Sequence, residues 1–365
     1  MSKWISANLS FVFGLDLSKD NIENRLDGAC ARYLNYYKKN SQIPYALFIN
    51  GNSSLNIRSG EGILGEKEQK IARAIFGEGP RDEATMDKGV YENYGIGREG
   101  FNVSSCQFAF HYFFENINTL KNFMINLADC TKLGGYFTGT CYDGKTVFNL
   151  LSQYKKGEEI SITKDETKIW SIIKDYSNET FEDYVTSLGY SINVYQDTIG
   201  QYFKEYLVNF DFVNRVMENY GFVLLSLTEA KEKGLPSSSG MFSELYSLKQ
   251  KELKFPLQDY EKQISFNNRY FVYKKIRSVD SKKINIESEL SSVAMPVDIN
   301  QQAEKIKKKI KLVINKPSQI NDASLPEKKK EKKEKKEKKE KKEKKEKKEK
   351  KDKKQKKEKK ENDSD

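Results

Sequence analysis

The order of apolar and polar positions predicts strands that alternate with helices in the first half of the chain. Short apolar runs ending in polar turns are typical of buried strands, and apolar residues three and four apart are typical of helices. The strand-like runs are LSFVFGL at 9–15, PYALFIN at 44–50, FNVSSCQF at 101–108 and GGYFTGTCYD at 134–143. Helical patterns lie at 19–40, 66–76, 118–132 and 144–154, and Gly134 and Gly135 are expected to stop the third of them. This alternation predicts an α/β domain with a mostly parallel sheet.

The pattern changes between residues 157 and 273. Strand-like segments at 168–176 and 190–198 precede a helical segment at 205–221, and strands are expected again at 222–230 and 269–278. This order fits an antiparallel insertion followed by a last strand of the main sheet. We predict one elaborated domain over residues 1–278, with a polar, glycine-rich insertion at 54–99.

The positive charge is concentrated at the end of the chain. Residues 327–365 hold 23 lysines and 13 acidic residues, so this segment carries +10 of the net charge of +11. Its repeated KKE pattern has no apolar residue to bury and predicts a disordered tail, which follows a polar linker at 279–326. The tail is either a solubilising extension or a sequence-independent contact with the phosphates of a nucleic acid.

Cysteine and histidine usage argues against a zinc site. The four cysteines form no CxxC pair, and the chain holds a single histidine, His111. Reduced thiols in an intracellular protein are the simplest interpretation. No apolar run reaches 18 residues and no leader pattern opens the chain, so we expect a soluble cytoplasmic or nuclear protein without a membrane partner.

Polar residues gather where predicted strands end. Asp16 ends the first strand, Asn50 to Ser54 follow the second, and Gln107 ends the third, with His111 and Tyr112 just beyond it. In nucleotide-binding α/β folds the carboxyl ends of the strands hold the ligand, and an acidic residue there binds ribose hydroxyls. Each residue also has a plain interpretation: Asp16 as a helix cap, the asparagines as a turn and His111 as part of an aromatic core.

The segment SCQFAFHYFFEN, followed by an amphipathic helix and LGGYFTGT, resembles the mRNA cap guanine-N7 methyltransferases. The resemblance includes GLDLSKDNIENRLDGACARY, NGNSS, KEYLVNF and RYFVYKK in the family's order, and it covers residues 1–277. DGACARYLNY is more similar to the large-DNA-virus members, whose compartment is the host cytoplasm or the virion. The resemblance implies a Rossmann-like sheet that binds S-adenosylmethionine (SAM), with capped RNA as substrate.

The resemblance also implies roles for single residues. Those implied for the cofactor are Lys3, Asp16 on the ribose, Asn52 and Ser53 near the adenine, and Gln107. Those implied for the cap guanine are His111, Tyr112, Glu205 and Tyr270. Asn52 departs from the family, which usually has an acid there. Guanine N7 has a lone pair and no proton, so the implied reaction works by alignment and needs neither a general base nor a metal.

The family's first strand and its glycine-rich SAM loop have no counterpart in the chain, so the chain by itself is expected to be inactive. A larger protein, a misplaced start and a decayed copy remain open as explanations, and other capping-enzyme domains or subunits are candidate partners that supply the segment. The alternative function is a catalytically incomplete RNA- or cap-binding module. A methyltransferase of small molecules fits less well, because it would not use a pair of residues that read guanine.

Overall fold

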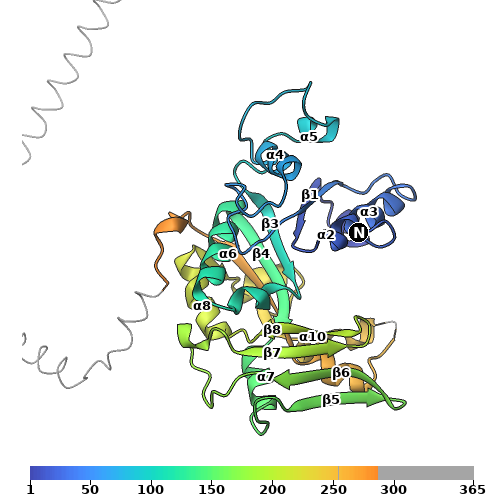
Figure 1. The fold of residues 1–365 in the computed structure, drawn as a ribbon, viewed down its shortest axis with the longest axis vertical. Coiled ribbons are helices and arrows are strands. Elements are labelled where there is room, and N and C mark those ends of the chain that lie inside the picture. Colours follow the sequence, from blue (N-terminus) through green and yellow to red (C-terminus); the bar gives the residue numbers. More distant parts are fainter. Residues whose placement is uncertain (254, 287–365) are drawn as a thin grey trace, which may run out of the picture. The chain divides into compact units, whose positions relative to one another are not determined.

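The computed structural model describes residues 1–253 and 255–286 (Figure 1). The strands are β1 (Phe11–Asp16), β2 (Tyr45–Asn50), β3 (Phe101–Gln107), β4 (Thr131–Tyr142), β5 (Glu159–Lys164), β6 (Thr167–Lys174), β7 (Ser191–Gln196), β8 (Gln201–Tyr206), β9 (Phe222–Leu224), β10 (Ser239–Met241) and β11 (Asn268–Lys275). The α-helices are α1 (Ser2–Ser6), α2 (Lys19–Glu23), α3 (Ala29–Tyr37), α4 (Glu66–Ile75), α5 (Lys88–Glu92), α6 (Ile117–Cys130), α7 (Gly144–Leu150), α8 (Phe210–Asn219), α9 (Leu227–Glu232), α10 (Phe242–Lys249) and α11 (Asp259–Ser265). Short 3₁₀ helices are η1 (Phe110–Phe114), η2 (Val185–Ser187), η3 (Gln250–Glu252) and η4 (Ser281–Lys283).

The strands of the described residues form three sheets. β1 and β2 form a parallel pair, and β3 and β4 form a second parallel pair inside the sheet β10-β11-β4-β3, where β9 also pairs with β11. The strands β5 to β8 form an antiparallel sheet in chain order. The α/β class and the antiparallel insertion are confirmed. The main sheet is mixed, however, because β11 runs antiparallel to β4, β9 and β10.

Two predicted boundaries are wrong. The helix predicted at 118–132 is α6, which ends at Cys130. Gly134 and Gly135 lie inside β4, where Gly134 has a φ of +77°. Glycine is favoured at any position with a positive φ, so a glycine near the start of a strand looks in the sequence like a glycine that ends a helix. The segment 205–221 is not helical throughout, because Glu205 and Tyr206 end β8 and the helix begins at Phe210, where the Asn209 side chain accepts from the N–H groups of Asp211 and Phe212.

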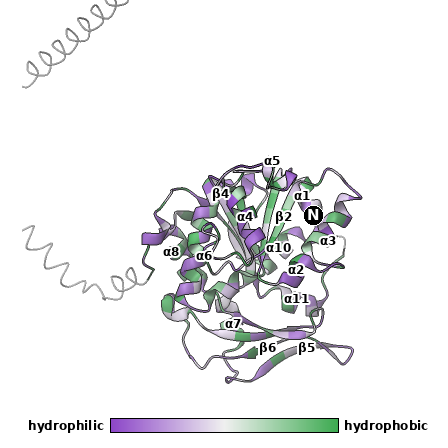
Figure 2. Ribbon diagram, turned by 45° about the horizontal axis from the view of Figure 1, so that its top comes forward, coloured by the Kyte–Doolittle hydropathy of each residue, from purple (hydrophilic) through white to green (hydrophobic). Residues whose placement is uncertain are grey.

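The largest apolar cluster packs the mixed sheet against helices α6 and α8. Phe110, Phe137 and Phe271 are buried in it, with ring centroids 5.2–5.6 Å apart. A second cluster, around Trp170 and Ile172, covers one face of the antiparallel sheet. In Figure 2, hydrophobic and hydrophilic residues alternate along both the helices and the strands. The aromatic residues around His111 are therefore mostly core, and they hold η1 in place.

The packed part of the chain extends to Ile286. Val279 and Ile284 lie against the largest apolar cluster and Ile286 is buried in it, while Ser281 donates to the carboxylate of Asp129. These residues belong to the start of the predicted linker at 279–326. The rest of that linker and the predicted tail at 327–365 lie outside the described residues. In the part that the structure describes, no helix is long and apolar enough to cross a membrane.

β1 and β3 are outer strands of separate sheets. Among residues 1–253 and 255–286, β1 pairs with β2 alone and β3 pairs with β4 alone. Between these sheets, the Phe101 ring lies 6.4 Å from the Phe11 ring and 6.1 Å from the Phe13 ring.

Candidate functional site

η1 turns the only histidine of the chain inward. Phe108 leaves β3 with a φ of +52°, in the left-handed region that non-glycine residues rarely adopt. The chain then enters η1, where Phe110 and Phe114 are buried and anchor the turn. His111 lies between these two residues in the sequence and is itself buried, so its imidazole faces the interior.

His111 meets Glu205 at the end of β8. Its Nε2 lies 3.5 Å from Oε2 of Glu205, and only 4% and 13% of the two side chains are exposed. Burial raises the pKa of Glu205 to about 8 and lowers the pKa of His111 to about 3. Both imidazole nitrogens lack a hydrogen-bond partner within the described residues. A buried polar group without a partner is costly, so the imidazole nitrogens of His111 are left unsatisfied in the interior.

Tyr112 links this pair to the edge of the cleft at Asp16. Its ring centroid lies 4.2 Å from that of His111, and 41% of the residue is exposed. The pKa of the Tyr112 hydroxyl is raised, first by burial and then by the negative charges of Glu205 and Asp16. Tyr112 is therefore near both carboxyl groups, and its exposed face is available to a flat ligand.

Gln107 and Tyr270 lie in one row across three strands. Thr140 of β4 is in register with Gln107 of β3 on one side and with Tyr270 of β11 on the other. The Thr140 hydroxyl donates to Oε1 of Gln107 at 3.0 Å, and the Tyr270 hydroxyl lies 2.9 Å from that of Ser237. Two residues predicted to contact different ligands therefore share the edge at which β3 and β4 end.

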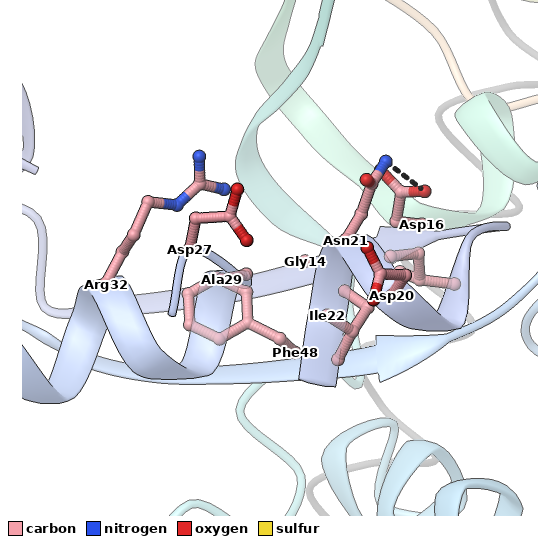
Figure 3. Close-up of a pocket in the computed structure, with 10 residues that line it drawn as sticks. Gly14, Asp16, Asp20, Asn21, Ile22, Asp27, Ala29, Arg32 and Phe48 are labelled. Atoms are coloured by element: carbon pink, nitrogen blue, oxygen red, sulfur yellow. Dashed lines mark hydrogen bonds between the residues drawn. The ribbon is translucent and has the colours of Figure 1, made fainter. Parts of the chain in front are cut away.

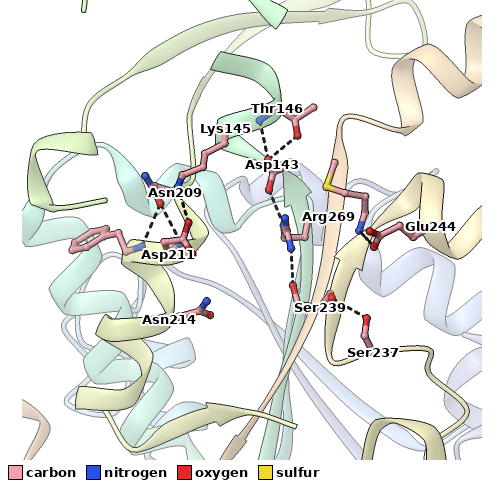
Figure 4. Close-up of polar contacts among 12 residues, drawn as sticks. Asp143, Lys145, Thr146, Asn209, Asp211, Asn214, Ser237, Ser239, Glu244 and Arg269 are labelled. Carbon is pink, nitrogen blue, oxygen red and sulfur yellow. Dashed lines mark hydrogen bonds and ion pairs between the residues drawn. The ribbon is translucent and has the colours of Figure 1, made fainter. Parts of the chain in front are cut away.

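A polar network, which the sequence did not reveal, fixes the loops around this edge (Figure 4). Nε of Arg269 lies 2.7 Å from Oδ2 of Asp143, a carboxylate whose side chain is 7% exposed. Oδ1 of Asp143 caps α7 by accepting from both N–H and Oγ1 of Thr146. Lys145 joins Asp211 at 2.6 Å and Asp183 at 2.7 Å. These contacts tie the segment after β4 to the segment that follows Glu205.

A cleft of about 350 Å³ lies at the end of β1 (Figure 3). Its lining is mostly polar and comprises Gly14, Leu15, Asp16, Asp20, Asn21, Ile22, Asp27, Ala29, Arg32 and Phe48. Oδ1 of Asp16 accepts from the Ser18 N–H at 2.8 Å and from the Asn21 amide at 3.2 Å. These donors orient the carboxylate so that its other oxygen is available to a ligand hydroxyl.

Three predicted cofactor residues, Asn52, Ser53 and Lys3, have no contact within the described residues with the His111–Glu205 pair or with Asp16. The Asn52 side chain accepts from the Ser54 N–H, and the Ser53 carbonyl accepts from Asn126, so both help to build a turn after β2. Lys3 is exposed on α1, where its neighbour Trp4 stacks on Phe48. Asn50, which the sequence placed among the polar residues at the end of the second strand, donates to the carbonyls of Asp16 and Leu17 and holds the end of β1.

Comparison with known proteins identifies one family. A family model described as the mRNA (guanine-N(7))-methyltransferase domain matches residues 68–363. A probable mRNA-capping enzyme of Acanthamoeba polyphaga mimivirus is 25% identical over 221 residues, which are 59% of this chain and 17% of that protein. The mRNA cap guanine-N(7) methyltransferase of Saccharomyces cerevisiae is 25% identical over 143 residues, which are 37% of this chain and 33% of that protein. The chain thus matches only a minor part of each of these relatives.

Solved structures show weaker similarity. The CcbJ methyltransferase of Streptomyces caelestis is 10% identical with a TM-score of 0.38, covering 76% of this chain and 88% of that chain. An S-adenosylmethionine-dependent methyltransferase of Clostridium acetobutylicum is 11% identical with a TM-score of 0.32, covering 75% of this chain and 87% of that chain. Both TM-scores are below 0.5, and the α/β fold rests on the strand pairing of the described residues.

Proposed function

Because the chain belongs to the mRNA (guanine-N(7))-methyltransferase family, we propose that it transfers a methyl group from SAM to N7 of the guanine that caps mRNA. The observation that carries this proposal is the buried pair of His111 and Glu205, which has no hydrogen bond between its members. The exposed ring of Tyr112 lies beside it. A purine placed there would find polar groups at its edge and an aromatic ring nearby.

Guanine fits this pair better than adenine does. The N1–H and the exocyclic amine of guanine are adjacent donors. Glu205 is protonated at neutral pH in the free protein, so we propose that it releases its proton when guanine binds and that the resulting carboxylate accepts from both donors. Adenine has no N1–H and leaves one carboxylate oxygen unpaired in a buried position, which costs about 1–3 kcal/mol. His111 is uncharged at neutral pH, so it donates one N–H to the base and has no role in transferring a proton.

The described residues fit the nucleoside part of SAM. Asp16, with one carboxylate oxygen held and the other free, suits a ribose diol. Gln107 is exposed at the end of β3 and suits the polar amino-acid end, and we keep Asn52, Ser53 and Lys3 as proposed contacts around the adenine and the carboxylate. When bound, SAM supplies a methyl group on a positively charged sulfur.

The protein's own contribution is alignment. N7 carries an in-plane lone pair and no proton, so none of these residues has to remove one. His111, Tyr112, Glu205 and Tyr270 would hold the guanine in one orientation, while Asp16 and Gln107 hold the donor. Fixing two reactants within reacting distance replaces a bimolecular encounter and accounts for a large part of the acceleration.

We propose capped RNA as the substrate and, as partners, other domains or subunits of a capping enzyme. The proposed compartment is the one where capped RNA is made: the cytoplasm, a virion or the nucleus. The second candidate function is a cap-binding module without methyl transfer. It is favoured by one observation: among residues 1–253 and 255–286, Asp16 and Gln107 lie on separate sheets that no ladder of hydrogen bonds joins.

Calorimetric titration of the full chain with the cap dinucleotides GpppG and ApppA tests guanine recognition. Glu205→Gln keeps the size of the side chain but replaces one acceptor oxygen with an NH2 donor that would face a donor of guanine, so the Kd for GpppG should rise about 10–100-fold. Lys204→Ala is the matched control, because Lys204 is the preceding residue on β8 and pairs with Asp175 instead. Equal affinity for GpppG in the Glu205→Gln variant and the parent chain would refute the assignment. Transfer of labelled methyl from SAM to GpppG then separates the enzyme from the binding module. It is measured with the chain alone, which is expected to be inactive, and with the family's first strand and glycine-rich loop fused upstream of it.

A further inference from the structure

The strand that carries Glu205 also carries an exposed phenylalanine. β8 is the outer strand of the antiparallel sheet, whose order is β5-β6-β7-β8 (Figure 1). Phe203 in this strand is 37% exposed, and Tyr202 and Ile199 nearby are 41% and 53% exposed. Single exposed apolar residues are common on protein surfaces, so exposure alone does not identify a site. Phe203 differs from the other two by its position relative to Glu205.

Phe203 lies on the same face of the sheet as Glu205. Side chains two residues apart in a strand point to the same face, and adjacent side chains point to opposite faces. Lys204, between the two in sequence, turns to the other face, where its Nζ lies 3.2 Å from the carboxylate of Asp175. With a rise of about 3.3 Å per residue, Phe203 and Glu205 are about 7 Å apart along the strand. An aromatic ring therefore stands one step from the residue proposed to read guanine.

Phe203 is supported on its inner side and open on its outer side. Its partner across the strands is Val194, and the partner of Glu205 is Ile192. Val194 is 3% exposed and Ile192 is 1% exposed, and both belong to the apolar cluster around Trp170. On its outer side, β8 pairs with no further strand of residues 1–253 and 255–286. The phenylalanine thus combines a packed base with a free surface, as a stacking platform for a flat ligand requires.

A capped RNA that reaches Glu205 brings a second flat group with it, a step that rests on the proposed function. The cap guanosine is joined through a triphosphate bridge to the first nucleotide of the RNA, and this flexible bridge lets the two bases lie side by side. A base about 7 Å along β8 from the guanine would meet the ring of Phe203. Aromatic side chains stack on any base, because every base has a π face, so this contact would not depend on RNA sequence.

We propose that Phe203 binds the first transcribed nucleotide of capped RNA by stacking on its base. Phe203 is then a second subsite next to the guanine pocket. It distinguishes the capped end of an RNA from free GTP, which has the guanine and the phosphates but no second base. The stacking adds affinity for either kind of purine at the second position, while the selection of guanine at the first position stays with Glu205.

Calorimetric titration of the full chain with GTP and with GpppA tests the proposal. We expect GpppA to bind at least about fivefold more tightly than GTP, which corresponds to about 1 kcal/mol for one stacked base. Phe203→Ala should remove this preference by weakening GpppA alone. Phe203→Leu, which keeps an apolar side chain against β7, should do the same, and Phe203→Tyr, which keeps a ring, should retain it.

Tyr202→Ala is the matched control. Tyr202 is the adjacent exposed aromatic residue of β8, but its hydroxyl donates to Oε1 of Glu159 at 2.7 Å on the opposite face of the sheet. Its removal should leave the preference for GpppA over GTP unchanged.

Three outcomes would overturn the subsite. The parent chain could bind GTP and GpppA equally well, Phe203→Ala could weaken both ligands by the same factor, or Tyr202→Ala could abolish the preference as Phe203→Ala does. Failure of the proposed function would look different. Binding of neither GTP nor GpppA, or equal binding of GpppA and ApppA, would refute the guanine pocket itself and this inference with it, whereas selection of GpppA over ApppA without a preference over GTP would refute the subsite alone.

Discussion

Nε2 of His111 lies 3.5 Å from Oε2 of Glu205, and these two buried groups come from η1 and from the last strand of the antiparallel sheet. A salt bridge at this depth would require charges on both side chains, but burial disfavours each charge. A neutral imidazole thus faces a carboxyl group that stays protonated up to pH values near 8. The contact between η1 and β8 is consequently not a stabilising ion pair.

The first prediction concerns stability as a function of pH. The folded protein keeps a proton on Glu205 up to about pH 8, whereas the unfolded chain loses it near 4.5. Stability is therefore lost as pH rises from 4.5 to 8. Glu205→Gln removes this dependence, so its gain in unfolding free energy should be near zero at pH 4.5 and reach a few kcal/mol at pH 8. Urea unfolding at several pH values measures it, and a gain that does not change with pH would contradict the burial of the charge.

The second prediction uses the single histidine of the chain. Burial lowers the pKa of His111 from 6.5 to about 3, so the folded protein should show a neutral imidazole throughout pH 5–8. The unfolded chain takes up a proton below 6.5, so His111 lowers stability progressively as pH falls towards 3. Because the chain has one histidine, the imidazole signals in an NMR titration all come from His111. A midpoint near 6.5 in the folded state would show that the side chain is exposed.

The third prediction concerns the ion pair between Arg269 and Asp143. Arg269→Met leaves the buried carboxylate of Asp143 with its cap contacts but without a counter-charge, and it removes the guanidinium 5.1 Å from the Phe210 ring. We expect a loss of about 3 kcal/mol in unfolding free energy. Lys19→Met is the control, because its pair with Glu23 is exposed and should contribute less than about 1 kcal/mol. Similar losses in both variants would argue against a structural role for the pair.

The fourth prediction concerns the lysine-rich end of the chain. Removing residues 327–365 takes away a net charge of +10. Binding of GpppG should not change, while binding of a long RNA should weaken and depend less steeply on salt, because fewer counterions are released. Filter binding at several salt concentrations measures the slope. An unchanged slope would assign the segment to solubility alone.

The elements that the sequence predicted well are those with a strong local signal. The strand ending at Gln107 and the helix after it follow from apolar spacing alone, and they position His111 and Tyr112. Glu205 was predicted to start a helix, because the apolar residues of YLVNFDFV have helical spacing. The helix instead begins at Phe210, because the Asn209 side chain caps it, and this contact is not visible in the apolar spacing. The partner of Arg269 was not predictable either, since Asp143 is 126 residues away and only the pairing of β4 with β11 brings them together.

The most direct measurement is a titration of the full chain with GpppG and, separately, with ApppA, followed on the NMR signal of His111. Because the chain has one histidine, that signal reports from inside the proposed guanine pocket. Our account predicts a saturable shift with GpppG that is absent in Glu205→Gln, and little or no shift with ApppA. The same shift with both dinucleotides, or none with GpppG at saturating concentration, would contradict guanine recognition by His111 and Glu205.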